Sequence, residues 1–484
     1  MRTNPSGRPS RSAFTMIELL VSMAISLVVV YALVEFMKTI GDTVTDGRAM
    51  IDLATQLRGV RQRLDEDLKS LTVQTRPWSD NGYFEYREGP LWDADADGNG
   101  TLDFNRASPT VNYDIENNGG NTLFGDWDDI LAFTAHSGAE PFVGQIDDGT
   151  FQGRNGGPTL TSQLSEIVWF CGFEDKDGDN VWDAGESRFI YRRTLLIRPD
   201  LGDGGSTYAS AAEAYNALAD FWQLNDLSVK VVNVGMGQWR LRANSLTDLS
   251  RRENRFAHQQ AFPSRWNFDP RGTSQYVFRA TATGPARLGE DVMMSRVLSF
   301  DVQVFDPDAS ILRLKSDPTG AALTPESPYY TPDRAKVDYG NGSGTYLEIG
   351  KGAFVDLGYA ASSPIAASPP QNRYRETVTN FSANGLLAYG PDGKSGFGNQ
   401  EWIWDTWSNS YEMDTVDQFS DSRTDTAHDG LDNDNQNGVD DVGERETSPP
   451  YPVPIRGLKV TMRIYDPNTR QVRQGTVTAE FLPE

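Results

Sequence analysis

Apolar residues occur first as one continuous run and then as a stripe with helical spacing. Residues 14–34, FTMIELLVSMAISLVVVYALV, contain a single charged side chain, that of Glu18. As an α-helix this run is about 31 Å long, which matches the hydrocarbon core of a bilayer at about 30 Å. The pattern therefore predicts one membrane-spanning helix near the N-terminus.

The same helix is expected to continue beyond the membrane. Apolar side chains recur at spacings of three and four residues, at Leu53, Leu57, Val60, Leu64, Leu68 and Leu71. Such spacing puts them on one face of a helix, and Pro77 marks the latest residue at which the helix ends. We expect a stalk helix over residues 14–75 whose amphipathic half packs on a sheet.

Beyond Pro77 the apolar positions alternate, as in β-strands. The expected strands are residues 130–135, 166–170, 188–198, 227–234, 238–242, 275–281, 297–305, 458–465 and 472–482. The Asp-Pro steps at 306–307 and 466–467 are expected to end the strands before them. The predicted fold class is α+β, with a β-rich body over residues 76–310, a loop-rich insertion over 311–450 and a C-terminal hairpin over 451–484.

The amino-acid composition argues against several classes of function. The net charge of the 484 residues is −24, and such a chain repels the phosphate backbone of nucleic acids. The lone cysteine, Cys171, excludes an intramolecular disulfide and a Cys-cluster metal site, and we expect it to be a buried strand residue. The three histidines lie far apart in the sequence. Because no nucleophile elbow or cofactor loop is found, we do not expect an enzyme.

The N-terminal segment has the charge pattern of a cytoplasmic leader. Residues 1–13, MRTNPSGRPSRSA, contain three arginines and no acid, so the positive-inside rule places the body on the far side of the cytoplasmic membrane. A carboxylate within a membrane span is costly, and Glu18 is therefore expected to have a partner. A secretory signal and a plain membrane anchor are the alternatives.

Residues 12–18, Ser-Ala-Phe-Thr-Met-Ile-Glu, resemble the cleavage site of type IV prepilins. The resemblance implies cleavage between Ala13 and Phe14 by a prepilin peptidase and N-methylation of Phe14. The chain has Ala13 where that family usually has Gly. The resemblance also implies that Glu18, the fifth mature residue, pairs with the Phe14 amine of a neighbouring subunit and sets the axial stagger of a filament.

The body resembles the J-type minor pseudopilin of type II secretion and the related W-type minor pilins. The similar segments are SEIVWF…RFIYRRTLLIRPDL and IRGLKVTMRIYDPNTRQVRQGTV. The resemblance implies a pilin-like, single-pass protein of the bacterial inner membrane with a periplasmic body. Its partners would be other pilin-like subunits and the inner-membrane assembly platform, and it would contribute to pseudopilus assembly and protein export.

A minor type IV pilin or a pilus-tip adhesin is the alternative function. In an adhesin, aromatic side chains would stack on a carbohydrate, with Trp402, Trp404, Trp407 and Tyr411 as the candidates. Packing within an otherwise coreless loop is the interpretation that we favour for them.

The negative charge is concentrated in three segments. Residues 93–130 hold nine acids and one base, residues 173–186 six and one, and residues 401–446 fourteen and two. Carboxylates crowded in this way repel one another unless a cation lies between them. Each segment is therefore a candidate calcium loop, although solvated turns rich in Asp, Asn and Gly are the alternative.

The middle segment has the clearest ligand spacing. Positions 1, 3, 5, 9 and 12 of an EF-hand loop are occupied by Asp175, Asp177, Asp179, Asp183 and Glu186, with the Val181 carbonyl at position 7. The first segment offers Asp93, Asp95, Asp97 and Asp103. The third resembles the calcium loops of thrombospondin type 3 repeats and offers Asp429, Asp432, Asp434, Asp440 and Asp441. Oxygen ligands at alternating positions favour calcium over zinc or copper.

Overall fold

The structure, a computed structural model, describes only part of the chain. The described residues are 15–88, 127, 129–146, 151, 159–173, 187–256, 258, 290–325, 327, 337–338, 342, 344–357, 402–417, 424–436, 438–441, 444–447, 449, 451, 453–466 and 471–481. The chain divides into two compact units. The first is Met1–Thr55 with Asp466–Gln471, and the second is Gln56–Tyr465 with Val472–Glu484.

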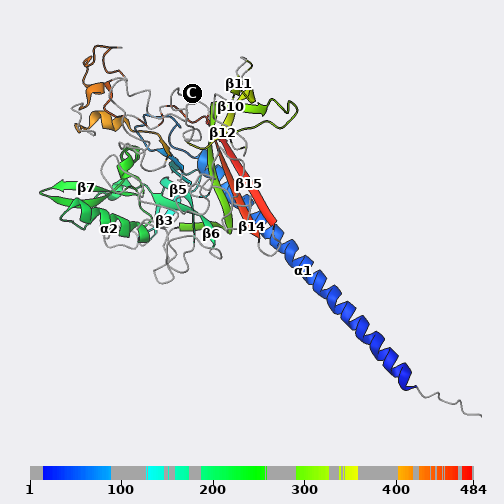
Figure 1. Cartoon of the computed structure of the whole chain (residues 1–484). Helices are drawn as coiled ribbons and strands as arrows, with labels where there is room; N and C mark the ends of the chain where they lie inside the picture. Colours follow the sequence, from blue (N-terminus) through cyan, green and yellow to red (C-terminus); the bar gives the residue numbers. More distant parts are fainter. Residues whose placement is uncertain are drawn as a thin grey trace, which may run out of the picture. The chain divides into compact units, whose positions relative to one another are not determined.

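One long helix begins the described chain. Helix α1 runs without interruption over Met16–Lys69 (Figure 1). The predicted apolar face is confirmed, since its leucines and valine are buried at Leu53, Leu57, Val60, Leu64 and Leu68. The helix ends earlier than the predicted residue 75, because Leu71 already forms a β-bridge with Ala135.

A six-stranded antiparallel sheet forms the centre of the second unit. Its strand order is β13-β1-β2-β5-β6-β9. The strands are β1 (Phe84–Glu88), β2 (Ile130–His136), β5 (Leu164–Phe173), β6 (Arg188–Leu196), β9 (Glu290–Ser295) and β13 (Trp402–Asp405). Strand β13 is remote in sequence yet pairs with β1 at the sheet edge.

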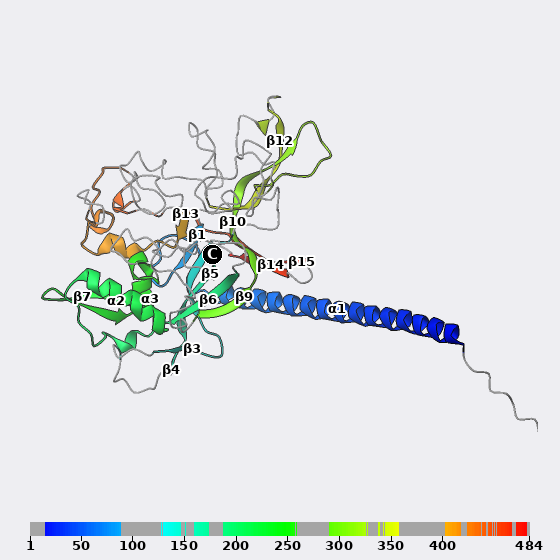
Figure 2. The ribbon, with the colours of Figure 1, turned by 60° about the horizontal axis from the view of Figure 1, so that its bottom comes forward.

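A five-stranded sheet accompanies it in the order β11-β12-β10-β14-β15. Its strands are β10 (Val297–Leu314), β11 (Val337–Asp338), β12 (Tyr346–Val355), β14 (Gly457–Asp466) and β15 (Gln471–Glu480). Figures 1 and 2 show β10, β14 and β15 side by side. The two sheets are linked at Val302, whose amide donates to Oδ2 of Asp129 at 2.6 Å and whose carbonyl accepts from the Tyr86 hydroxyl.

Smaller elements complete the described chain. Two hairpins are formed by β3 (Phe142–Gln145) with β4 (Thr159–Ser162) and by β7 (Val229–Gly235) with β8 (Gln238–Ala243). The short helices are α2 (Ala211–Leu224), α3 (Leu246–Ser250), η2 (Pro199–Leu201), η3 (Arg252–Asn254), η7 (Asn409–Met413) and η8 (Thr426–His428).

The two faces of the six-stranded sheet are covered differently. Val168 and Phe170 of β5 belong to the same buried apolar cluster as Phe221 of α2. The residue between them, Trp169, points to the opposite face because side chains alternate along a strand. There its indole nitrogen donates to Asp67 of α1 at 2.9 Å. The end of α1 therefore packs on one face and α2 on the other, which confirms the expected packing of a helix on a sheet.

The predicted α+β class is confirmed, with one long apolar helix followed by a β-rich body. Eight of the nine expected strands match observed ones, including the final hairpin of β14 and β15. The ninth, residues 275–281, lies outside the described residues.

Two details of the prediction are wrong. Strand β10 does not end at Asp306-Pro307 but continues to Leu314. Its register with β12 shifts between Asp306 and Ser310, and such an irregularity accommodates a proline that cannot donate a hydrogen bond. The segment 311–450 is also more than a loop, because two of its strands belong to the sheets. Strand β13 is part of the six-stranded sheet and β12 is part of the five-stranded sheet.

Candidate functional site

The first part of α1 is an apolar surface exposed to solvent. From Met16 to Ile40 its large hydrophobic side chains are exposed, among them Leu20, Val28 and Phe36. Among the described residues, α1 is the one helix that is long and apolar enough to cross a membrane. An exposed apolar surface of this size needs lipid or other apolar helices around it.

Glu18 and Thr15 form a reciprocal cap at the start of α1. The backbone amide and the hydroxyl of Thr15 each donate to Oε2 of Glu18 at 2.9 Å. In return, the Glu18 amide donates to the Thr15 hydroxyl oxygen at 3.3 Å. This is a capping box, which satisfies amide groups that have no partner within the helix. The cleavage and methylation residues, Ala13 and Phe14, lie outside the described residues.

Two of the three predicted calcium loops also lie outside the described residues. This holds for Asp93, Asp95, Asp97 and Asp103 and for Asp175, Asp177, Asp179, Val181, Asp183 and Glu186. Their calcium ligation stays a prediction.

The third predicted loop is described, and it brings together some of its expected ligands. Asp432 and Asp434 each place a carboxylate oxygen within 4.8 Å of one on Glu444. Glu444, 2% exposed, accepts the amides of Asp434 at 3.2 Å and Asp441 at 3.1 Å. The sequence analysis missed Glu444, although it lies only three residues beyond the predicted acidic run.

The other predicted ligands of this loop do not join that group. Asp429 accepts the Leu431 amide at 2.8 Å, and Asp440 accepts the Gly430 amide at 3.0 Å. Such contacts stabilise turns. Asp441 contributes its own amide to Glu444 rather than a carboxylate oxygen to the group.

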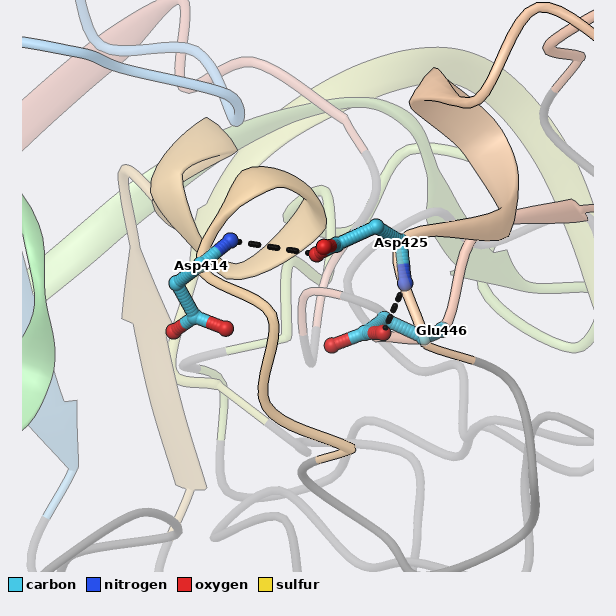
Figure 3. A group of neighbouring side chains, drawn as sticks. All are labelled: Asp414, Asp425 and Glu446. Atoms are coloured by element: carbon cyan, nitrogen blue, oxygen red, sulfur yellow. Dashed lines mark hydrogen bonds between the residues drawn. The ribbon is translucent and has the colours of Figure 1, made fainter.

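A second carboxylate group lies between η7, η8 and the segment 444–447. Asp414, Asp425 and Glu446 each place a carboxylate oxygen within 4.8 Å of the others (Figure 3). Burial raises the pKa of Glu446 to about 8, and the neighbouring acids Glu412, Asp414 and Asp425 act in the same direction. No spacing motif connects these residues, so the only signal in the sequence was the acidic segment 401–446 that contains all three.

The aromatic residues near this group are part of the core. Trp404, Trp407 and Tyr411 are at most 1% exposed, and the indole nitrogen of Trp407 donates to the Thr447 hydroxyl at 3.0 Å. These three side chains are therefore packing residues, as we favoured, and they offer no surface for carbohydrate stacking. Cys171 is likewise buried in β5, as expected.

A buried set of ion pairs anchors β13, from which the acidic segment begins. Glu85 of β1 and Asp405 of β13 are cross-strand partners. Nη1 of Arg255 lies 2.6 Å from Oε2 of Glu85 and 2.9 Å from Oδ2 of Asp405. Nε of Arg252 lies 3.0 Å from the same Asp405 oxygen. Two acids thus face two guanidinium groups, a balanced arrangement that fastens β13 to the sheet.

His258 completes this set, with Nε2 at 3.2 Å from Oε1 of Glu85. Burial alone would raise the pKa of Glu85, but His258, Arg255 and Arg252 outweigh it and hold that pKa well below its ordinary value. Burial lowers the pKa of His258. The charge of Glu85 and its hydrogen bond to the imidazole raise the pKa of His258, but burial, assisted by Arg255 and Arg252, outweighs them.

A polar cavity of about 870 Å³ adjoins the end of α1. Its lining includes Asp67, Arg192, Asp226 and Asp291. Asp67 is held by Arg192 at 2.6 Å and Asp226 by Arg193 at 3.0 Å. These carboxylates already serve as partners of buried guanidinium groups, which is a structural use.

Comparison with known families gave one match. Residues 8–33 match the family of the prokaryotic N-terminal methylation motif. No curated protein and no solved structure matched the chain. The matched segment contains the predicted cleavage site, Glu18 and the start of the exposed apolar helix. The match, the helix and the β-rich body together support a type IV pilin-like prepilin, a subunit of the pilin or pseudopilin type.

Proposed function

We propose that the chain is a minor pseudopilin-like subunit of a type II secretion pseudopilus, with a role in pseudopilus assembly and protein export. The match of residues 8–33 to the methylation motif carries this proposal. A prepilin peptidase would cleave between Ala13 and Phe14, and Phe14 would be methylated. The subunit would span the bacterial inner membrane once, with its leader cytoplasmic and its body periplasmic. Its role is structural rather than enzymatic.

Glu18 is the residue most closely tied to this role. In the single chain its carboxylate caps its own helix through Thr15. In a filament we propose that it pairs with the Phe14 amine of a neighbouring subunit, since a carboxylate among packed apolar helices is tolerated only with a partner. Two roles, helix capping and subunit pairing, therefore need to be separated.

Substitutions by Gln and by Ala separate them. Gln can still accept the Thr15 hydrogen bonds, because capping boxes use Glu or Gln, but it carries no charge. We expect Glu18→Gln and Glu18→Ala both to abolish incorporation into filaments, measured by cross-linking to other pilin-like subunits in the native host. Incorporation of Glu18→Gln at the wild-type level would show that capping, and not charge, is the function.

Correct processing is the control for this experiment. Mass spectrometry of each variant should show an N-terminus at methylated Phe14, so that a loss of incorporation is not a failure of cleavage. A wild-type chain that starts at Met1 or beyond residue 34 would contradict the prepilin proposal itself.

A minor type IV pilin is the alternative assembly, and the same N-terminal features support it. Deletion of the gene distinguishes the two. Loss of protein export without loss of surface pili supports the pseudopilus, whereas loss of pili with normal export supports the type IV pilus. Neighbouring genes for prepilin-like proteins and a secretion ATPase would also support an assembly role, while an isolated gene would favour an adhesin.

We also propose that calcium stabilises the body through its acidic loops. Among the described residues, this proposal is supported by the carboxylate oxygens of Asp432, Asp434 and Glu444, which lie within 4.8 Å of one another. Three carboxylates at this separation repel one another without a cation, and hard oxygen ligands suit calcium. The loops at 93–103 and 175–186 are part of this proposal on their sequence patterns alone.

A further inference from the structure

We infer that Asp414, Asp425 and Glu446 form a second, separate binding site for a divalent cation of the calcium type. The site lies within the third acidic segment, residues 401–446, but uses none of the ligands predicted there, and it does not depend on the assembly role. Three short segments supply it. Asp414 follows η7, Asp425 is the N-cap of η8, and Glu446 lies between η8 and β14.

The three carboxylates converge on one space. Each offers an oxygen within 4.8 Å of the other two, a spacing that fits oxygens bound to one calcium ion at about 2.3–2.6 Å. Figure 3 shows the three side chains turned toward this space. Oε2 of Glu446 accepts the Asp425 amide at 2.7 Å, and Oδ1 of Asp425 accepts the Asp414 amide at 3.1 Å, so the backbone holds the ligands in place.

Glu446 supplies an independent sign that a ligand belongs there. Its side chain is only 1% exposed, and Oε1 is buried without a hydrogen-bond partner. A buried carboxylate oxygen without a donor is costly and uncommon in native proteins. Because Oε2 is held by the Asp425 amide, Oε1 faces the shared space, where a cation would satisfy it.

The local charge balance selects a divalent cation. Nη2 of Arg251 lies 3.1 Å from Oδ2 of Asp414. Cation binding requires the ionised form of the ligands, and among the described side chains the three ionised acids and this guanidinium sum to −2. The nearby Glu412 is not a member of the carboxylate group, and burial raises its pKa. Glu412 instead accepts the amides of Glu446 at 2.9 Å and Thr447 at 3.1 Å.

The ligand type favours calcium among divalent cations. All candidate ligands are carboxylate oxygens, which suit calcium and magnesium and not zinc or copper. Magnesium requires an octahedral shell at about 2.0–2.1 Å, whereas calcium accepts irregular shells completed by water. Asp414 is partly held by Arg251 and Asp425 by amides, so the ligands are not free to contract around the smaller ion.

Calcium titration of the full-length protein in detergent, stripped with EDTA, tests the site. The key variant is Glu446→Gln, whose amide oxygen can still accept the Asp425 hydrogen bond. We expect calorimetry to show that this variant loses one calcium site, or binds at that site at least tenfold more weakly. The matched control is Asp432→Asn with Asp434→Asn, which alters the other carboxylate group and should leave this site intact.

Thermal unfolding provides a second test, because the difference in melting temperature between Glu446→Gln and the wild type should change sign when calcium is added. In EDTA, Glu446→Gln should melt higher than the wild type, because it removes an unpartnered buried carboxylate. In millimolar calcium it should melt lower than the wild type, because it cannot be stabilised through this site. A buried acid with no ligand would give no such reversal.

Asp414→Asn is the second variant, in case Glu446→Gln does not fold, and it should show the same loss of a calcium site. The inference is overturned if Glu446→Gln, or Asp414→Asn in its place, binds calcium with wild-type stoichiometry and affinity. It is equally overturned if sodium or magnesium at matched ionic strength replaces calcium fully. Loss of binding only in the Asp432 and Asp434 variant would support the loop proposal and refute this second site.

Discussion

His258 lies fully buried beside Glu85, and this position makes it sensitive to pH. Burial lowers the pKa of its imidazole in the folded protein, whereas in the unfolded chain a histidine binds a proton below about pH 6.5. The unfolded state thus binds more protons in this range, so the free energy of unfolding rises with pH. Stability contributed by neutral His258 is therefore present above about pH 6.5 and is lost as the pH falls below it.

We predict that His258 lowers the free energy of unfolding by at most about 1.4 kcal/mol per pH unit as the pH falls from 7 to 5.5. Glu446, whose pKa is raised to about 8, contributes in the opposite direction over this range, so the test compares the slopes of variants. His258→Gln should flatten this slope, measured by urea unfolding of the full-length protein in detergent. His136→Gln, at an exposed position in the same chain, is the control and should leave the slope unchanged. Equal slopes for His258→Gln and the wild type would contradict the argument.

At the scale of elements, the end of α1 is fastened to the sheet by Asp67. Its carboxylate accepts from Nε of Arg192 at 2.6 Å and Nη2 at 3.0 Å, and from Trp169 at 2.9 Å. Asp67 and Arg192 are almost completely buried. Removal of one member of such a pair leaves an uncompensated buried charge, which costs about 3–5 kcal/mol.

We predict that Asp67→Ala lowers the free energy of unfolding by about 3–5 kcal/mol. Asp65→Ala is the matched control on the same helix, because Asp65 pairs with Lys69 at 2.6 Å at the surface. An exposed pair of this kind contributes only about 0.3–0.5 kcal/mol. Similar losses for the two variants would show that the Asp67 contacts do not anchor the helix.

At the scale of the whole molecule, our calcium proposal predicts that the acidic loops link stability to calcium. A site that binds only the folded state adds about 2.7 kcal/mol at a hundredfold excess of ligand over Kd. We predict that millimolar calcium raises the melting temperature and that magnesium at equal ionic strength does much less. Asp432→Asn with Asp434→Asn should reduce the calcium effect. An unchanged melting temperature on addition of EDTA would mean that the loops are solvated turns.

The sequence was sufficient for features that depend on neighbouring residues. The apolar run, the stripe from Leu53 to Leu68 and the strand pattern of β5 predicted α1 and most of the sheet. The helix period and the strand alternation are set within a few residues, so they can be read locally. Glu18 was recognised because its place after Phe14 in the apolar run is itself a local pattern.

Contacts between distant segments were decided only by the tertiary structure. The sequence placed Asp67 outside the apolar stripe, yet the sheet buries it because Arg192 lies opposite. Asp414, Asp425 and Glu446 are 11 and 21 residues apart, and their convergence depends on chain reversals that no periodic pattern records. The periodicity of side chains along a helix or strand shows which face of that element is apolar. It does not show which carboxylates will lie together, because that depends on long-range packing and on the buried ion pairs that hold the elements in place.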